Sequence, residues 1–280
     1  MELKRVVVTG LGAITPLGND VASTWEAAIA GKSGAGPITH FDASLFKTQF
    51  ACEVKNFNAA EHISDRKKLR QLDLYAQYAL VAARQAVEDS GLETSEGVDR
   101  NRIGVIVAAG IGGLHTFEEE AGYYALNHEK GPKYNPFFIP KMIADIASGH
   151  ISMEYGYHGP NYGVVSACAS SNNAIIDAFN YIRLGKADAF VTGGAEAAVF
   201  PAGVGGFNSM HALSTRNDSP ETASRPFSKS RDGFVIGEGS VVLVLEELEH
   251  AKARGAKIYA EVVGGGMSAD AYHITATHPE

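Results

Sequence analysis

The chain has 280 residues, of which 45% are hydrophobic and 20% are charged, values typical of a globular protein that buries a substantial core. The net charge of −8 argues against a general nucleic-acid binder. The longest apolar stretch, at 187–207, is interrupted by Asp188, Glu196 and several glycines, so we expect no membrane span. Neither Cys52 nor Cys168 has the spacing of a disulfide framework or a metal site, and the scattered histidines give no reason to expect a metal.

The start of the chain, MELKRVVVTG, carries Glu2 and passes directly into a strand-like run. It lacks the small-residue cleavage site of a signal peptide. We therefore expect a cytoplasmic protein.

The first predicted elements are a buried strand at 5–9, a glycine-rich turn at 10–15 and a helix at 20–30 that stops at Gly31. A single long helix is predicted from Ser64 or Asp65, with an apolar stripe that continues until Gly91 ends it. The opening scheme is thus strand, turn, helix, helix.

The middle of the chain alternates strands with helices. Strands are predicted at 102–109, 162–166 and 187–192, and helices from Pro140 to just before Gly156 and at 170–184. This alternation predicts an α/β fold.

After a polar loop at 214–232, the glycines near residue 238 predict a hairpin of strands 234–236 and 241–245, followed by a short helix ending at Gly255. KIYAEVVGGGMS at 257–268 then repeats the scheme of KRVVVTGLGAIT at 4–15. We expect a first half at 1–255 and the start of a second α/β half at 256–280, truncated at Glu280.

Two glycine motifs are partly similar to phosphate-binding sequences. GLGAIT at 10–15 follows a strand, but Thr15 replaces the third glycine of a dinucleotide fingerprint and Pro16 follows it, so a structural turn is favoured. GKS at 31–33 ends a helix instead of starting one, unlike a P-loop. We expect no cofactor.

Cys168 is the candidate nucleophile. In YGVVSACASSNN it lies where a β-branched strand meets a helix through small residues, which is typical of a nucleophile elbow. The free amides and partial positive charge of a helix N-terminus favour a thiolate and stabilise an oxyanion. Cys52, in the alternating run QFACEV, instead fits a buried structural thiol.

The elbow VVSACASS belongs to a series of motifs that resembles the β-ketoacyl-acyl-carrier-protein synthase II family, which consists of thiolase-fold ketosynthases. The others are VVVTGLGAITPLG, GIGG at 110–113, VGGFNSMHALSTRNDSP at 204–220, the segment from RPFSKSRDGFVIGEGS to AKARGAKIYAE at 225–261, and SADAYHIT at 268–275. The resemblance implies a layered αβαβα fold of two similar halves in a homodimer. This chain would cover the first half and the start of the second.

The resemblance also implies roles for individual residues. Cys168 would carry the acyl group as a thioester, Ile111 would line the acyl pocket, and Phe207 would lie near it. The family's two catalytic histidines lie in later motifs, which begin beyond Glu280, so His273 and His278 are not assigned to them.

The implied activity is a decarboxylative Claisen condensation in fatty acid elongation, with acyl- and malonyl-loaded acyl carrier protein as partners. The alternatives are a polyketide ketosynthase, a non-catalytic binding subunit such as a chain-length factor, and an inactive fragment. Cys168 argues against the binding subunit, in which that cysteine would be replaced.

A basic cluster is the candidate docking site for the acidic carrier protein. SDRKKLRQLD concentrates Arg66, Lys67, Lys68 and Arg70 at a predicted helix start, and the resemblance places carrier contacts at this helix. A solvated helix end is the alternative. His211, with Arg216, would extend the cluster.

Overall fold

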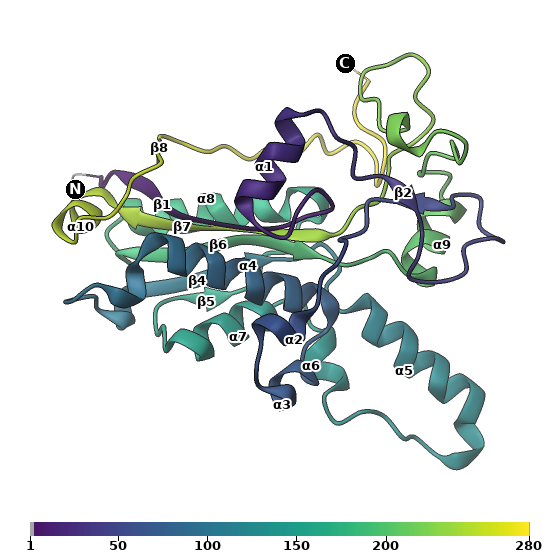
Figure 1. The fold of residues 1–280 in the computed structure, drawn as a ribbon, viewed down its shortest axis with the longest axis horizontal. Helices are drawn as coiled ribbons and strands as arrows, with labels where there is room; N and C mark the ends of the chain where they lie inside the picture. The colour runs from purple at the N-terminus through teal and green to yellow at the C-terminus, as the bar shows by residue number, and fades with distance from the viewer. Residues whose placement is uncertain (1–2, 280) are drawn as a thin grey trace.

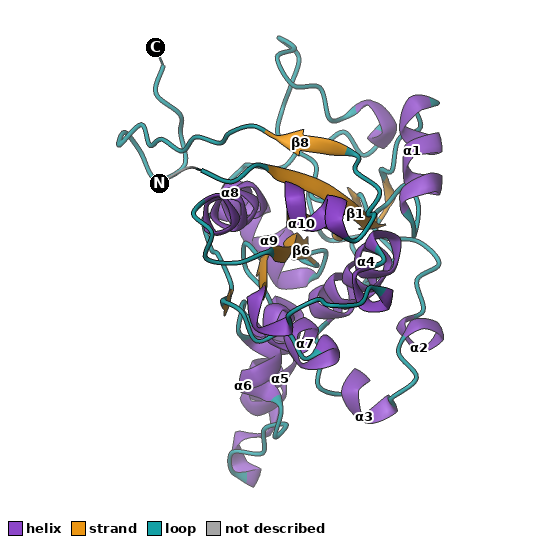
Figure 2. Ribbon diagram, turned by 90° about the vertical axis from the view of Figure 1, so that its left-hand side faces the viewer, coloured by secondary structure: helices purple, strands orange, loops and turns teal. Residues whose placement is uncertain are grey.

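The computed structural model describes residues 3–279 and has three layers. A mixed six-stranded sheet lies between two helices, α4 (Leu74–Ser90) and α7 (Ile146–Tyr155), on one face and α8 (Ser170–Arg183) on the other (Figures 1 and 2). This arrangement confirms the predicted α/β class.

The strand order is β5, β4, β6, β7, β1, β8. The first three strands run parallel, and every later neighbour is antiparallel. Their bounds are Asn161–Tyr162 for β5, Ile103–Ala108 for β4, Ala189–Glu196 for β6, Gly239–Glu247 for β7, Val6–Ile14 for β1 and Ala260–Val262 for β8. Compared with the sequence prediction, β5 is shorter and β6 extends to Glu196.

The predicted turn at 10–15 is wrong, because β1 continues through it to Ile14. Its glycines serve a close contact between layers. A Cβ on Gly10 would lie 2.1 Å from the carbonyl oxygen of Ala86, and a Cβ on Gly12 would lie 1.9 Å from that of Ala82. The absence of side chains lets the α4 backbone rest directly on the strand.

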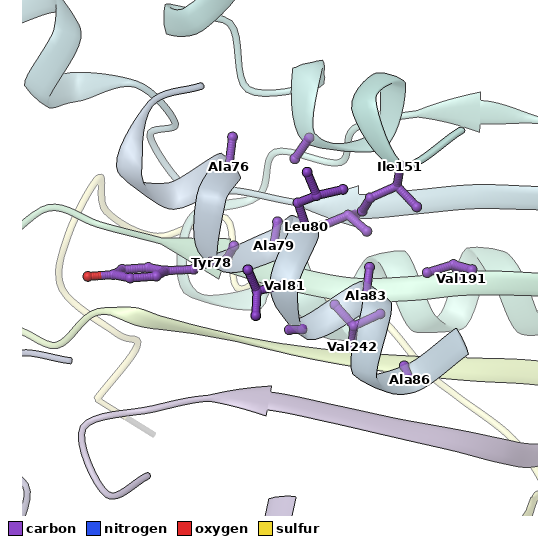
Figure 3. Packing of buried hydrophobic residues seen from close by; sticks show 14 of the residues in the cluster. Ala76, Tyr78, Ala79, Leu80, Val81, Ala83, Ala86, Ile151, Val191 and Val242 are labelled. Carbon is purple, nitrogen blue, oxygen red and sulfur yellow. The ribbon is translucent and has the colours of Figure 1, made fainter. Parts of the chain in front are cut away.

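The largest core cluster lies between the sheet and α4. Figure 3 shows Leu80 and Ala83 of α4 beside Ile151 of α7 and the strand residues Val191 and Val242. Buried alanines dominate one side of α4, so helix and sheet approach closely. A second cluster joins the other sheet face to α8 through Ala174, Ala178, Phe179 and Ile182.

Two predicted helices are each divided in two. The helix expected from residue 65 to 90 consists of α3 (Arg66–Leu69) and α4, because Asp73 adopts an extended conformation and caps α4 through the Tyr75 N–H. The helix expected from Pro140 consists of α6 (Phe138–Met142) and α7, with Ile143 extended between them. The Tyr75 hydroxyl donates to the carbonyl of Ile143 at 2.6 Å and fixes this break.

The predicted hairpin at 234–245 is also wrong. β7 pairs with β1 on one side and β6 on the other, so both of its edges are occupied. The preceding segment forms isolated bridges instead, between Phe234 and Leu213 and between Gly237 and Cys52.

The remaining elements surround these layers. They are α1 (Val21–Ile29), α2 (Ala59–His62), α5 (Leu114–Asn127), α9 (Pro201–Ser209), α10 (Leu248–Ala253) and the two-stranded sheet of β2 (Gly36–Pro37) and β3 (Phe50–Ala51), with short 3₁₀ helices at Leu92–Thr94, Arg100–Arg102, His128–Lys130, Ala167–Ala169 and Pro220–Thr222. The predicted helices at 20–30, at 170–184 and before Gly255 are confirmed by α1, α8 and α10. Within residues 3–279, no helix combines the length and apolar character needed to cross a bilayer.

The strand predicted to open a second half is β8, which lies at the edge of the sheet and pairs antiparallel with β1. The division of the chain at residue 255 stays a prediction.

Replacing Gly12 by alanine tests the contact between β1 and α4. We expect Gly12→Ala to lower the free energy of unfolding by about 3 kcal/mol, because backbone atoms of α4 must move to admit the methyl group. Gly122→Ala is the matched control. Gly122 lies in α5 with nothing within 4 Å of an added Cβ, so the free energy of unfolding of this variant should rise by about 0.5 to 1 kcal/mol. Urea titrations of both variants measure the difference, and equal stabilities would contradict the close-contact interpretation.

Candidate active site

The site residues lie where the three parallel strands end. The carboxyl ends of β5, β4 and β6 meet at the same sheet edge, the usual place for a ligand site in α/β proteins. The elbow with Cys168 follows β5, the turn with Ile111 follows β4, and Glu196 is the last residue of β6. A Cβ on Gly110 would lie 3.6 Å from the Ala167 carbonyl oxygen, so the turn and the elbow are neighbours.

Cys168 lies in a single 3₁₀ turn, Ala167–Ala169, immediately before α8. Its predecessor Ala167 has φ +51°, in the left-handed region that a residue with a Cβ rarely adopts. The Cys168 side chain is exposed. This is the geometry of a nucleophile elbow, in which a strained backbone presents the sulfur to solvent beside a helix N-terminus.

Three hydrogen bonds hold the elbow in this conformation. The Ser166 N–H donates to Ser170 Oγ at 2.8 Å, and the Ser170 hydroxyl donates to the Ala167 carbonyl at 2.7 Å. One turn further along α8, Asn173 Nδ2 donates to Ser166 Oγ at 2.7 Å. Ser170 is buried and all three bonds are partly shielded from water, so together they fix the strained residue.

Small residues around the elbow leave room for α8 to approach the sheet. A Cβ on Gly194 of β6 would lie 2.0 Å from Ser171 Oγ. A larger residue at 194 would therefore displace the start of α8 and, with it, Cys168.

Cys52 has a different environment. It follows β3 and is half-buried, and its N–H donates to the Ile236 carbonyl at 2.9 Å. Burial raises the pKa of the Cys52 thiol, while Lys55 acts in the opposite direction. These observations favour the structural interpretation of Cys52.

Glu196 is a site residue that the sequence reasoning missed. Its carboxylate accepts the N–H groups of Gly110 at 2.8 Å, Ile111 at 2.8 Å and Gly112 at 3.1 Å. Burial raises the pKa of Glu196, and the backbone N–H donors act against this rise. The signal in the sequence was an acidic residue closing a buried strand whose parallel neighbour ends in a glycine turn.

The two predicted pocket residues occupy different surroundings. Ile111 lies in the turn held by Glu196, and the residue is 44% exposed. Phe207 lies on α9, where it packs edge-to-face on Phe234 with ring centroids 5.2 Å apart and joins a cluster with Val204 and Leu213. Their roles in acyl binding stay predictions.

The predicted docking cations gather on and just after α3. Arg66, Lys67 and Arg70 are exposed, whereas Lys68 forms an ion pair with Glu154 and its side chain is only 19% exposed. Asp65 caps this helix through the Lys67 N–H at 2.8 Å.

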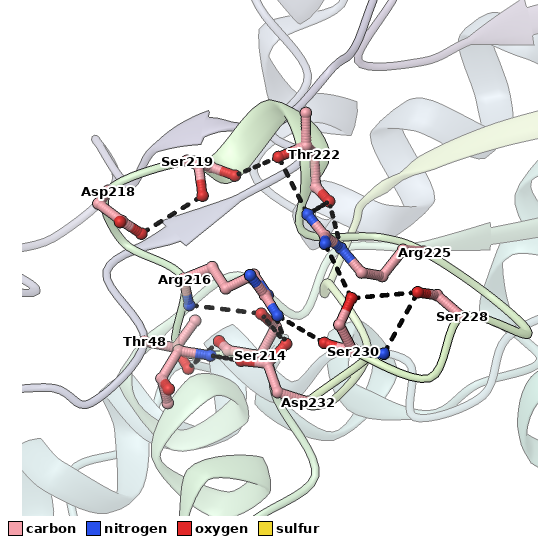
Figure 4. Close-up of polar contacts among 11 residues, drawn as sticks. Thr48, Ser214, Arg216, Asp218, Ser219, Thr222, Arg225, Ser228, Ser230 and Asp232 are labelled. Atoms are coloured by element: carbon pink, nitrogen blue, oxygen red, sulfur yellow. Dashed lines mark hydrogen bonds and ion pairs between the residues drawn. The ribbon is translucent and has the colours of Figure 1, made fainter.

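His211 and Arg216 lie in the loop after α9. His211 is exposed and has a left-handed backbone with φ +55°. The Arg216 guanidinium lies within a polar network (Figure 4). Its Nε donates to Asp232 Oδ1 at 3.2 Å, and its Nη2 donates to the Ser230 carbonyl. Its charge is therefore compensated within the chain.

No grouping of three or more His, Cys, Asp or Glu side chains suited to a metal ion occurs in the described part of the chain, residues 3–279. The GLGAIT motif lies inside β1 with its glycines against α4, which leaves no cradle there for a dinucleotide.

The chain is similar to proteins named 3-oxoacyl-[acyl-carrier-protein] synthase 2. It is 51% identical to that of Coxiella burnetii over 280 residues, which is 100% of this chain and 67% of the relative. It is 52% identical to that of Vibrio cholerae over 276 residues, which is 98% of this chain and 66% of the relative. The chain thus spans about two thirds of the length of these relatives.

Solved structures agree with these similarities. A β-ketoacyl synthase from Burkholderia phymatum superposes with a TM-score of 0.87 at 34% identity, over 98% of this chain and 66% of that protein. A type II polyketide ketosynthase, solved with its acyl-carrier protein and bound to a hexaketide, superposes with a TM-score of 0.84 at 32% identity, over 97% of this chain and 64% of that one. These likenesses confirm the predicted thiolase-like fold. Residues 3–251 match the family model of the β-ketoacyl synthase N-terminal domain, and the chain therefore belongs to the β-ketoacyl synthase family.

Proposed function

We propose that the protein is a β-ketoacyl-acyl-carrier-protein synthase that elongates fatty acyl chains, with Cys168 as its nucleophile. The observation that carries this proposal is the exposed Cys168 on a strained elbow before α8, in a chain about half identical to synthases of that name. An exposed cysteine held by its backbone beside a helix N-terminus is suited to forming a thioester.

The reaction follows a two-step scheme. The Cys168 thiolate attacks the carbonyl carbon of an acyl-carrier-protein thioester, and the carrier thiol leaves as the acyl group passes to Sγ. Malonyl-carrier protein then loses carbon dioxide, and the resulting carbanion attacks the Cys168 thioester. This step releases the thiolate and yields the β-ketoacyl-carrier protein. In this scheme the backbone N–H of Cys168 would donate to the negative charge on the carbonyl oxygen.

Ile111 and Phe207 would border the acyl chain in this scheme. Ile111 is exposed on the turn beside the elbow, which suits a residue that contacts substrate, and Phe207 presents a partly buried aromatic ring on α9. The family's two catalytic histidines would come from the part of the relatives' length that this chain does not span. No cofactor is needed, because the leaving carboxylate supplies the electron pair.

A polyketide ketosynthase is the second candidate, favoured by the fold neighbour that was solved with a type II polyketide acyl-carrier protein. That neighbour is 32% identical to this chain, whereas the synthase 2 proteins are about half identical, which supports the fatty acid pathway. A ketosynthase/chain length factor pair is a further neighbour at 34% identity, but Cys168 argues against a purely non-catalytic role.

A homodimer is supported by large apolar side chains left exposed on and near α5 and α6. Phe117, Leu126, Tyr134 and Ile139 are between 42% and 86% exposed. These elements extend away from the three layers in Figure 1, where a second copy could cover them.

Mass spectrometry of the protein after proteolysis tests the nucleophile. After incubation of the full-length protein with an acyl-loaded carrier protein, we expect the mass of one acyl group on the peptide that contains Cys168. Cys168→Ala should abolish this acylation, whereas the matched control Cys52→Ala should retain it. Acylation that survives Cys168→Ala would overturn the proposal.

We also propose that α3 and its flanking Arg70 dock the acyl carrier protein, and that His211, in the loop after α9, is a further contact. Lys67 and Arg70 are exposed and form no ion pair with an acidic side chain within residues 3–279, unlike Lys68, which pairs with Glu154. A local positive surface on an acidic protein steers an acidic partner towards it.

Charge reversal tests this docking surface. We expect Lys67→Glu with Arg70→Glu to lower kcat/KM for acyl-carrier protein about tenfold at low salt, because steering is lost, and to leave transfer from a small acyl thioester nearly unchanged. Added salt should lower the kcat/KM of the wild type for acyl-carrier protein more than that of the variant. Lys32→Glu with Lys186→Glu reverses two exposed charges outside α3 and serves as the control. If the two double variants have equal kinetics, α3 is a solvated helix and not a docking surface.

A further inference from the structure

The turn that carries Ile111 is anchored by one carboxylate. Glu196 Oε2 accepts the N–H groups of Gly110 and Ile111, and Oε1 accepts that of Gly112. Three consecutive backbone donors thus converge on a single side chain. A carboxylate suits this task because both of its oxygens accept and neither donates.

Hydrophobic packing does not explain the position of Ile111, because the residue is 44% exposed. The downstream end of the turn is held separately, since the Gly113 N–H donates to the Met142 carbonyl at 3.0 Å. The upstream end, residues 110 and 111, therefore depends on Glu196 for its conformation.

Glu196 also links the turn to the elbow. A Cβ on Gly110 would approach Glu196 Oε2 to 2.8 Å and the Ala167 carbonyl oxygen to 3.6 Å, so Gly110 fills the space between the carboxylate and the residue before Cys168. A displacement of the turn changes the space in front of Cys168, into which an acyl chain must pass.

We infer that Glu196 is a positioning residue that sets the acyl chain-length selectivity by holding Ile111 out of the path of the chain. This inference rests on the proposed function. If the carboxylate is removed, the turn becomes mobile and the Ile111 side chain lies part of the time in the path of an acyl chain towards Cys168. The kcat/KM for long acyl chains then falls more than the kcat/KM for short ones.

Glu196→Gln and Glu196→Ala test the inference in the full-length protein. An amide at 196 has one acceptor oxygen, so in either orientation its NH₂ group faces at least one backbone N–H. The ratio of kcat/KM for palmitoyl- over butyryl-carrier protein should fall about threefold in Glu196→Gln and about tenfold in Glu196→Ala. Ile111→Phe should shift the ratio in the same direction, because it fills the path of the acyl chain directly.

A double variant separates positioning from general destabilisation. Ile111→Ala added to Glu196→Gln should restore the ratio, because the obstructing side chain is gone while the loose turn remains. Glu246→Gln is the matched control. Glu246 is a buried carboxylate beside the opposite end of β6, so this variant should lower the thermal transition without changing the ratio. A ratio unchanged in both Glu196 variants, or not restored by Ile111→Ala, would overturn the inference.

Hydrogen exchange supplies a readout independent of activity. The amides of Gly110 to Gly112 should exchange about tenfold faster in Glu196→Gln than in the wild type. Unchanged exchange would mean that the carboxylate does not hold the turn. If exchange rises as expected but the wild type never acylates Cys168, the proposed function fails, and the selectivity role fails with it, while the anchoring itself stands.

Discussion

The close contact between β1 and α4 determines where the site elements can lie. Gly10 and Gly12 let the α4 backbone rest on the sheet, and this fixes the start of the helix at the edge where the parallel strands end. From there Asp73 accepts the Thr116 N–H at 3.0 Å and so holds the first turn of α5. The Tyr75 hydroxyl holds the segment between α6 and α7, which in turn receives the Gly113 N–H. The turn with Ile111 is thus secured from the α4 side as well as from β6.

The elbow illustrates how backbone strain is balanced locally. Ala167 in a left-handed conformation costs on the order of 1 kcal/mol. Three short polar side chains, on Ser166, Ser170 and Asn173, offset this cost with hydrogen bonds to one another and to the backbone. None of them needs to touch a substrate to matter, because each fixes the direction in which the Cys168 side chain leaves the backbone.

Much of the fold and the elbow could be predicted from the sequence, because they depend on local patterns: β-branched strands, helices ended by Gly31 and Gly255, and a cysteine among small residues between strand and helix. The failures concern contacts between distant residues. The glycines at 10–15 have the sequence pattern of a turn, but in the structure they allow close contact with α4. The breaks at Asp73 and Ile143 depend on partners elsewhere in the chain. The role of Glu196 was not predicted, because its three hydrogen-bond donors lie in the turn after another strand, far away in the sequence.

The placement of β1 has a consequence for how the chain reaches this structure. Val6 pairs with Glu247 on one side and Val262 on the other, so the first strand finds its neighbours only in the last part of the chain. Contacts between residues so distant in sequence slow folding, because a long loop must close before they form. During synthesis the β1 segment and the apolar face of α4 are made well before β7. A nascent chain that has passed Cys168 already carries the proposed nucleophile, yet it still lacks the strand that joins the two sides of the sheet.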